Sequence, residues 1–409
     1  MRDTEFYQQV LGLSDNWQAA DVNLDIEGGK VEILVVHAGG GLSCPVCGFS
    51  APVHDHAPER SWRHLDTCQL KTLLHCRVPR VKCSEHGVKT VSVPWAEPHG
   101  RFTALFEQVV IRFLHATRNK TAVAERLGLT FDEVHSIMER AVERGLARRD
   151  EHPMRQLGLD EKSMKRGHKY LTVLTDLENS CVHDVAEGRK QVQAESLLNE
   201  LSELQRKTVS CVCMDMWEPY RRAVEKILPN AAVVHDRFHI SQHLNDAVDN
   251  TRRRERRQLS TEQLPALKHS RYLFLRNYEN LLEWQATNFK YASRVAVKTA
   301  GVWESKELFR EFWNQPSVAN ARTFLARWYK DAKAKNLPEL NKVAKMILRH
   351  AKGLLTYFDH KVTNSMAENL NGKIQQLKSA ARGFRSFERY RLNILFHYGK
   401  LSMEPLKIL

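Results

Sequence analysis

The sequence predicts a multidomain protein of the α/β class, and three features of its 409 residues support that prediction. Two Cys/His pairs with metal-ligand spacing lie in a strand-rich N-terminal region. An amphipathic helical stretch follows. Beyond it, short apolar runs alternate with amphipathic helices, and two of these runs lead directly into aspartates. A chain of this length is too long for one average domain and long enough for two to four.

The charge balance indicates a polyanionic partner. The chain has 62 Lys and Arg against 48 Asp and Glu, a formal net charge of +14 at pH 7. Such a surplus favours binding to nucleic acid, and a merely soluble basic protein is the alternative. No apolar run approaches the ~20 residues that span a bilayer, and the N-terminus lacks the apolar core of a signal peptide. We therefore expect a cytoplasmic protein with no membrane partner, whose eight cysteines stay reduced.

Residues 1–100 are predicted to form a zinc-binding β-ribbon domain. Two half-sites with two donors each complete a tetrahedral structural Zn²⁺ site. The donors are Cys44 and Cys47 in CPVCG, and Cys83 and His86 in KCSEHG. A redox pair or simply buried thiols are the alternatives. The fourth ligand is open at this point, because the loop between the half-sites also carries His54, His56 and His64.

Residues 101–150 have the pattern of a helix-turn-helix DNA-binding domain. One amphipathic helix is followed by two more, separated by Gly128, which suits the turn. The helix that begins at Phe131 is expected to be the recognition helix, with His135 and Ser136 facing outward near its start. Basic residues of the preceding segment are expected to bind DNA phosphates, namely Arg118, Lys120 and Arg126. The alternative is an ordinary three-helix bundle that does not contact DNA.

Residues 151–239 are predicted to begin an α/β core. The expected elements, in order, are strands over 155–160, 169–178 and 180–189, a helix over 191–206, a strand over 207–215, a helix over 217–228 and a strand over 230–238. This β-β-β-α-β-α-β order is that of the ribonuclease-H-like fold, in which metal-binding carboxylates lie at the ends of the first and fourth strands. Asp160 and Asp215 occupy those ends.

A third carboxylate is expected after a long interruption. Residues 240–360 are predicted to be an all-helical insertion with its own core, to which tryptophans and phenylalanines contribute. Glu368 then lies in a polar stretch with helical spacing, among the C-terminal helices of the core at residues 361–409. Three carboxylates that converge can hold two divalent cations, which stabilise the attacking and leaving oxygens of an in-line phosphoryl displacement. The pattern suggests a nuclease or a polynucleotidyl transferase.

Two polar clusters follow the fifth strand. TRRRERRQ contains Arg252, Arg253 and Arg254. Such a run is usually a solvated helix face, and contact with DNA phosphates is the equal alternative. In HDRFHISQH, a second zinc site is the less favoured interpretation. A supporting role of Asp236 and His239 beside the catalytic metals, or a DNA contact, is preferred.

The chain closely resembles transposases of the ISL3 family of bacterial insertion sequences over nearly its whole length. The helix-turn-helix and both Cys/His half-sites contribute to the resemblance. The other segments that carry it are SWRHLD, VPWAEP, GLDEKS, CMDMWEPYRRA, VVHDRFHI and the tail NSMAENLNGKIQQLKSAARGFRSFERYRLNILF.

The resemblance implies a DDE transposase that acts on the terminal inverted repeats of its own element. It also implies a ribonuclease-H-like core interrupted by a helical insertion. On this basis Asp160, Asp215 and Glu368 are the catalytic carboxylates and bind Mg²⁺ or Mn²⁺. The expected partners are double-stranded DNA, both as inverted repeats and as target, and further copies of the chain. The expected location is the bacterial cytoplasm, in association with the nucleoid.

One chain holds one active site while an element has two ends, so a homodimer or a larger synaptic assembly is expected. A DNA-binding regulator that uses the remaining residues as a scaffold is the first alternative. A structure-selective nuclease is the second. A regulator has no need for carboxylates on two strands and a late helix, and a structure-selective nuclease has no need to bind a specific end sequence.

Overall fold

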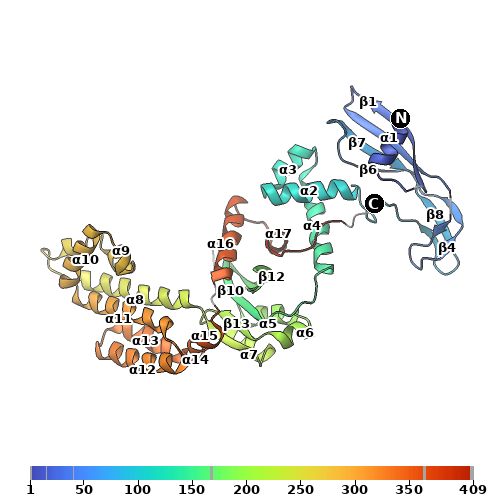
Figure 1. Cartoon of the computed structure of the whole chain (residues 1–409). Helices are drawn as coiled ribbons and strands as arrows, with labels where there is room; N and C mark the ends of the chain where they lie inside the picture. Colours follow the sequence, from blue (N-terminus) through green and yellow to red (C-terminus); the bar gives the residue numbers. More distant parts are fainter. Residues whose placement is uncertain (1, 15, 40, 166–168, 363–364, 406–409) are drawn as a thin grey trace. The chain divides into compact units, whose positions relative to one another are not determined.

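The computed structural model of the chain describes all residues except 1, 15, 40, 166–168, 363–364 and 406–409 (Figure 1). The chain divides into two compact units, one of Met1–Arg149 with Leu401–Leu409 and one of Asp150–Lys400. Each unit has apolar clusters of its own. Among the described residues, every helix is too short or too polar to cross a membrane.

A four-stranded sheet with the order β1-β2-β7-β6 forms the N-terminal part of the first unit. Its elements are α1 (Asp3–Val10), β1 (Trp17–Asp25), β2 (Lys30–His37), β6 (Arg60–Arg63) and β7 (Lys71–Cys76). Strands β1 and β2 are antiparallel, whereas β2 and β7 are parallel. Trp95 packs edge-to-face on Trp17 and on Trp62, with ring centroids 5.1 and 5.6 Å apart. These rings, which bury large apolar areas, hold the sheet together.

Short strands carry the two Cys/His half-sites. They are β3 (Leu42–Ser43), β4 (Ser50–Ala51), β5 (Val53–His56), β8 (Pro79–Cys83) and β9 (Gly87–Thr90). Strands β5, β8 and β9 form an antiparallel sheet, and β3 pairs with β4. Gly48 and Gly87 follow the two half-sites at φ +75° and +68°. Glycine adopts this left-handed conformation readily, so each half-site can turn back tightly on itself.

Three helices complete the first unit, namely α2 (Ala104–Thr117), α3 (Lys120–Leu127) and α4 (Phe131–Ala147). The turn between α3 and α4 contains Gly128 in the left-handed conformation, at φ 62°. Thr130 caps α4 and forms a capping box with Glu133. Val123 and Ile137 are fully buried between the helices. These caps and apolar contacts reproduce the helix-turn-helix pattern predicted from the sequence.

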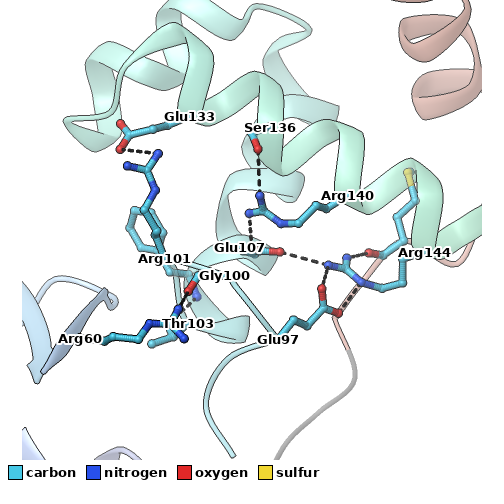
Figure 2. Close-up of polar contacts among 12 residues, drawn as sticks. Arg60, Glu97, Gly100, Arg101, Thr103, Glu107, Glu133, Ser136, Arg140 and Arg144 are labelled. Atoms are coloured by element: carbon cyan, nitrogen blue, oxygen red, sulfur yellow. Dashed lines mark hydrogen bonds and ion pairs between the residues drawn. The ribbon is translucent and has the colours of Figure 1, made fainter. Parts of the chain in front are cut away.

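A buried ion-pair network joins α4 to α2 and to the segment before α2 (Figure 2). Arg144 donates to both oxygens of Glu97, at 2.7 and 2.8 Å, and to Oε2 of Glu107 at 3.1 Å. Arg140 pairs with the other oxygen of Glu107 and donates to the Ser136 hydroxyl at 2.9 Å. The side chains of Glu107 and Arg144 are only 3 % and 7 % exposed. Their charges are therefore compensated by each other rather than by water.

The C-terminal segment packs on the same helices. Arg144 also donates to the carbonyl of Met403, and the Glu404 carboxylate accepts from the Gln108 amide at 2.7 Å. Gly145 leaves room for this segment, because a Cβ there would lie 2.6 Å from Cβ of Leu401. Residues 401–405 thus contribute to the first unit, although they follow the last helix of the second.

A five-stranded sheet with the order β12-β11-β10-β13-β14 is the centre of the second unit. Its strands are β10 (Gln156–Lys165), β11 (Lys169–Asp176), β12 (Cys181–Glu187), β13 (Cys211–Met214) and β14 (Ala232–His235). Strands β10, β11 and β12 are antiparallel neighbours, whereas β13 runs parallel to both β10 and β14.

Helices cover both faces of this sheet. They are α5 (Gln191–Asn199), α6 (Glu203–Thr208), α7 (Glu218–Ile227), α16 (Ser365–Ala380) and α17 (Phe387–Tyr398). Successive strand residues point to opposite faces. Leu174 of β11 accordingly packs with residues of α5 and α7, whereas Leu171 and Val173 pack with residues of α16 and α17. An ion pair between Arg391 of α17 and the buried Asp184 of β12 adds to this packing.

Several elements of the core differ from their predicted limits, among them β13 and β14, which are shorter than the expected 207–215 and 230–238. Strand β10 does not end at Asp160 but continues to Lys165, because β11 keeps pairing with it beyond that point. The single helix predicted over 191–206 is two helices, since Ser202 breaks the run and caps the start of α6.

The segment between β14 and α16 is built from helices with a core of their own. The α-helices are α8 (Arg237–Arg256), α9 (Arg271–Leu275), α10 (Glu283–Val295), α11 (Val297–Arg310), α12 (Val318–Ala334), α13 (Pro338–Arg349), α14 (Ala351–Leu355) and α15 (Tyr357–His360). The 3₁₀ turns are η1 (Leu264–Leu267), η2 (Tyr278–Asn280) and η3 (Glu311–Asn314). Phe309 and Trp328 belong to this core, and their ring centroids are 4.7 Å apart. Trp284 does not contribute to it, because it is exposed.

The buried network of the first unit predicts a large effect of Glu107→Ala. Removal of this carboxylate leaves Arg140 without its ion-pair partner and Arg144 with Glu97 alone, and breaking a buried ion pair typically costs about 3–5 kcal/mol. We expect urea unfolding of the first unit to show a loss of about this size. Arg112→Gln is the control, because its ion pair with Glu404 is solvent-exposed and should contribute less than about 0.5 kcal/mol. Equal losses in the two variants would contradict the prediction.

Candidate functional site

Three aspartates lie in a row across neighbouring strands of the central sheet. The register of β10, β13 and β14 pairs Leu159 with Met214, and Met214 with His235. The next residues are Asp160 in β10, Asp215 directly after β13 and Asp236 directly after β14. Because neighbouring strands are ~4.8 Å apart, this register brings the three backbones side by side.

Glu368 approaches the row from α16. Leu370, Ile374 and Leu377 pack this helix against the sheet. Asn371, which follows Glu368 by one helical turn, donates a hydrogen bond from Nδ2 to Oδ2 of Asp160. Residues three apart lie on the same side of a helix. Glu368 is therefore on the side of α16 that meets Asp160.

Burial and mutual repulsion raise the pKa of these carboxyl groups. Burial raises the pKa of Asp160 and raises the pKa of Asp215 to about 6, with the charge of Asp160 adding to the latter shift. The pKa of Glu368 rises to about 7, first through burial and then through Asp236. His239 acts in the opposite direction on all three pKa values. Such a cluster is less stable without a cation than with one.

The acceptor atoms of this cluster fit a divalent cation. Glu368 Oε1 and Asn371 Oδ1 are buried, and neither has a hydrogen-bond partner among the described residues. An unsatisfied buried acceptor is costly, and a bound cation or its water satisfies it. Mg²⁺ binds carboxylate oxygens and keeps several water ligands. The carboxylate oxygens are less tightly grouped than the Cys/His donors, which are the one set in the described part of the chain whose ligand atoms all lie within 4.8 Å.

That tighter group is Cys44, Cys47, Cys83 and His86 in the first unit. Sγ of Cys47 and Sγ of Cys83 are 3.7 Å apart, and Nδ1 of His86 is 3.6 Å from Sγ of Cys83. A tetrahedral site with Zn–S bonds of about 2.3 Å has edges of ~3.8 Å, so the donors fit Zn²⁺. The backbone N–H of His86 lowers the pKa of the Cys83 thiol to about 6. This shift favours the thiolate, which is the form that binds metal.

The other candidate histidines lie outside this group. His64 is buried, and its Nδ1 is 2.9 Å from the Thr103 hydroxyl. His54 and His56 are exposed. The structure therefore brings His86, rather than a loop histidine, to the three cysteines.

The residues expected to contact DNA in the helix-turn-helix have different surroundings. Arg118 and Arg126 are exposed, and Nζ of Lys120 lies 3.1 Å from Nδ1 of His135. His135 was predicted to face outward, but it is only 9 % exposed, because α4 packs against both α2 and α3. Ser136 is half-buried and accepts a hydrogen bond from Arg140.

The three arginines of α8 that were predicted to contact DNA phosphates are only partly available for such contacts. Arg252 is buried and donates to Oδ1 of Asp249 at 2.7 and 3.0 Å. The predicted contact of this side chain with a DNA phosphate does not fit that environment. Arg253 and Arg254 are exposed, but they pair with Asp249 and Glu339 at 2.9 and 2.8 Å.

One residue of the carboxylate cluster has no sequence motif of its own. Asn371 is almost fully buried and bonded to Asp160. Its spacing of three residues from Glu368 is the signal in the sequence that indicates a shared helix face.

Comparison with known proteins identifies the family of this chain. Residues 157–394 match a family model described as a transposase, of the DDE type and the ISL3 group. Residues 42–86 match the zinc-finger of the transposases of IS204, IS1001, IS1096 and IS1165. Residues 91–142 match the helix-turn-helix domain of transposase family ISL3. The chain belongs to the ISL3 family of DDE transposases.

Two relatives extend this similarity over most of the chain. The transposase for insertion sequence element IS1557 of Mycobacterium tuberculosis is 27 % identical over 416 residues, covering 94 % of this chain and 93 % of the relative. The transposase for IS1001 of Bordetella parapertussis is 25 % identical over 358 residues, covering 86 % and 88 %. The protein is therefore a DNA transposase with a helix-turn-helix domain that binds DNA, and its family implies catalysis that depends on divalent metal.

The Cys/His group predicts that Cys83→Ser removes bound zinc. A hydroxyl is a far weaker Zn²⁺ ligand than a thiolate, and structural sites use all four protein donors. Purified wild-type protein should contain about one zinc per chain by elemental analysis after dialysis, and the variant much less. Cys68→Ser is the matched control, because Cys68 is an exposed cysteine of the same unit that lies outside the group. An unchanged zinc content in Cys83→Ser would contradict the assignment of Cys83 as a zinc ligand.

His64 predicts a pH dependence of stability in the first unit. Burial lowers the pKa of His64 from 6.5 to about 4. The contribution of His64 to the free energy of unfolding is therefore fully present above pH 6.5, where the imidazole is neutral in both the folded and the unfolded state. As pH falls toward 4 the unfolded state is protonated first, so about 3 kcal/mol is lost.

In urea unfolding between pH 7 and pH 4, His64→Gln should give a flatter dependence on pH than the wild-type protein. His54→Gln, at an exposed site, should keep the wild-type slope. A wild-type slope in His64→Gln would show that another group causes the dependence.

Proposed function

We propose that this transposase recognises the terminal inverted repeats of its element, and cuts and joins DNA strands with two divalent cations held by Asp160, Asp215 and Glu368. The observation that carries the proposal is the row of aspartates across β10, β13 and β14, which Glu368 meets from α16. Each of the three carboxyl groups has a raised pKa in the absence of a cation. Carboxylates in this situation gain stability by binding metal.

We assign the core to the ribonuclease-H-like fold. Three antiparallel strands followed by two parallel ones, with helices on both faces, support this assignment. In this proposal residues 151–239 and 361–409 form the core, and residues 240–360 are an insertion. The separate apolar core of the inserted helices supports that division. Residues 1–100 and 101–150 are the zinc-binding and helix-turn-helix domains.

The residues of the site have distinct tasks. Asp160 and Asp215 are carried by strands that hydrogen-bond to each other, so their backbones cannot separate without breaking the sheet. Asn371 holds one oxygen of Asp160, while the backbone N–H of Glu161 donates to the other at 2.7 Å. Bound Mg²⁺ or Mn²⁺ would supply stabilisation of the attacking and leaving oxygens. Asp236, with His239 Nε2 at 3.7 Å from its Oδ2, supports the site from the start of α8, directly after β14.

DNA recognition is assigned to the first unit. The helix-turn-helix match and the exposed Arg118 and Arg126 support this part of the proposal. The Cys/His group holds a structural Zn²⁺, which stiffens the small strands around it. Because one chain carries one set of carboxylates and an element has two ends, the active assembly contains at least two copies.

Neutral variants of the three carboxylates test this function. Asp160→Asn, Asp215→Asn and Glu368→Gln keep the side-chain shape but remove the charge that binds the cation. Each should reduce Mg²⁺-dependent cleavage and strand transfer on a duplex of the element's own end by about 10³-fold or more, which corresponds to ~4 kcal/mol of lost transition-state stabilisation. End binding in a gel-shift assay should change little, because recognition lies in the other unit.

Glu225→Gln is the control, because this exposed carboxylate on α7 is paired with Arg221. Wild-type strand transfer by Glu368→Gln, together with an inactive Asp236→Asn, would make Asp236 the third ligand instead. Cleavage of branched DNA regardless of its end sequence would indicate a structure-selective nuclease. Binding without any metal-dependent cleavage by the wild-type protein would indicate a regulator.

A further inference from the structure

An arginine beside the carboxylate row packs against two aromatic rings. Cζ of Arg189 is 4.0 Å from the ring centroid of Tyr170 and 5.3 Å from that of Trp217. The indole Nε1–H of Trp217 donates to the carbonyl of Arg189 at 3.1 Å. The orientation of the Trp217 ring is therefore fixed by a hydrogen bond at its edge and a cation at its face.

Both Arg189 and Trp217 are linked directly to the carboxylate row. The backbone N–H of Trp217 donates to Oδ1 of Asp215 at 3.0 Å. Nη1 of Arg189 lies 3.1 Å from Oε1 of Glu161, the residue after Asp160. A group that contacts this ring consequently lies close to the position of the reacting phosphate.

A cavity of about 890 Å³ opens beside Trp217, with Gly188, Lys190 and Arg222 among its lining residues. This volume is ample for one nucleotide, since small-molecule sites are typically 300–1,000 Å³. Trp217 is 38 % exposed, unlike Trp313 and Trp328 in the helical core. It also lines a neighbouring cavity of about 830 Å³ with the exposed side chains of Arg349 and Lys352.

We infer that the cavity beside Trp217 binds an unstacked nucleotide of the DNA strand that is cut, with its base stacked on the indole and its phosphate near Arg222. This inference rests on the proposed function, which brings that strand to the carboxylates. Every base has a flat π-face, so an exposed aromatic ring binds unstacked bases with little regard to sequence. In a continuous duplex the faces of the bases are covered by their stacked neighbours, so an indole cannot stack on them. Moving one nucleotide out of the stack exposes its base to the Trp217 ring, while the backbone of the same strand stays beside the carboxylates.

An abasic scan of the element's end tests this inference. Full-length wild-type protein, Trp217→Leu, Trp217→Phe and the control Trp284→Leu are compared on duplexes that lack a single base at successive positions around the cleavage site. Trp284 is another exposed tryptophan, located on α10. Cleavage is measured in Mg²⁺, and affinity is measured in Ca²⁺ so that binding is tested independently of catalysis.

We expect Trp217→Leu to cut or bind the intact duplex about tenfold less well than the wild-type protein, a loss within the range for base–aromatic stacking. At one position next to the cleavage site, base removal should lower cleavage and affinity of the wild-type protein. The same base removal should leave Trp217→Leu unchanged, because this variant already lacks the ring on which the base stacks. Trp217→Phe, which keeps an aromatic face, should remain within about threefold of wild type. Additive effects at every position, or identical behaviour of the Trp217 and Trp284 variants, would overturn the inference.

Arg222→Gln tests the same cavity without altering Trp217. This exposed side chain on α7 should reduce the salt dependence of end binding by the equivalent of about one phosphate contact. Lys207→Gln, at an exposed site on α6, should leave the salt dependence unchanged. An unchanged slope in Arg222→Gln would contradict the phosphate contact. An intact abasic signature in Ca²⁺ without wild-type cleavage in Mg²⁺ would instead refute the proposed function and leave the nucleotide site standing.

Discussion

The second unit depends on one constraint, the electrostatic repulsion among its clustered carboxylates. The sheet holds the backbones of these residues together, so they cannot move apart. The register of β10, β13 and β14 sets Asp160, Asp215 and Asp236 side by side. Buried acids in contact normally respond by taking up protons, and the raised pKa values of Asp215 and Glu368 reflect that response. This repulsion is unfavourable in the protein without a cation, and under the proposed function a bound cation would relieve it. Apolar packing of α16 and α17 against the sheet keeps Glu368 in place against this repulsion.

The first unit deals with buried charge in the opposite way. Glu97 and Glu107 neutralise Arg140 and Arg144 in the helical part, so these groups require no external ion. The Cys/His group, by contrast, gathers four metal-ligand side chains on short strands, of which β4 and β8 contribute Ala51 and Val81 to the apolar core. Strands of two to five residues bury little surface by themselves, and under the proposed function a metal held by the four side chains would compensate for that deficit. The two halves of this unit therefore have different requirements, and the C-terminal segment packs against the helical half.

The family, the three carboxylates and the Cys/His donors were accessible from the sequence because each depends on local spacing. Paired cysteines, an apolar run that leads into an aspartate and a capped helix are patterns within a few residues, and the family assignment was confirmed by the comparisons. The order of the five strands in the core was also predicted correctly, whereas the single helix predicted between β12 and β13 is two helices, α5 and α6. The catalytic and metal-binding roles of the individual residues stay predictions.

Contacts between distant segments were decided only by the tertiary structure. The length of β10 depends on how far β11 follows it, and the burial of His135 and Arg252 depends on helices that pack over them. Asn371 meets Asp160 across 211 residues of sequence, and Arg189 meets the Trp217 ring although α5, α6 and β13 separate the two residues in the chain. A sequence determines by itself what each segment can form, because propensity, capping and ligand spacing are local. Which polar side chains end up buried together is determined only when the segments pack, since burial is a property of the assembled core.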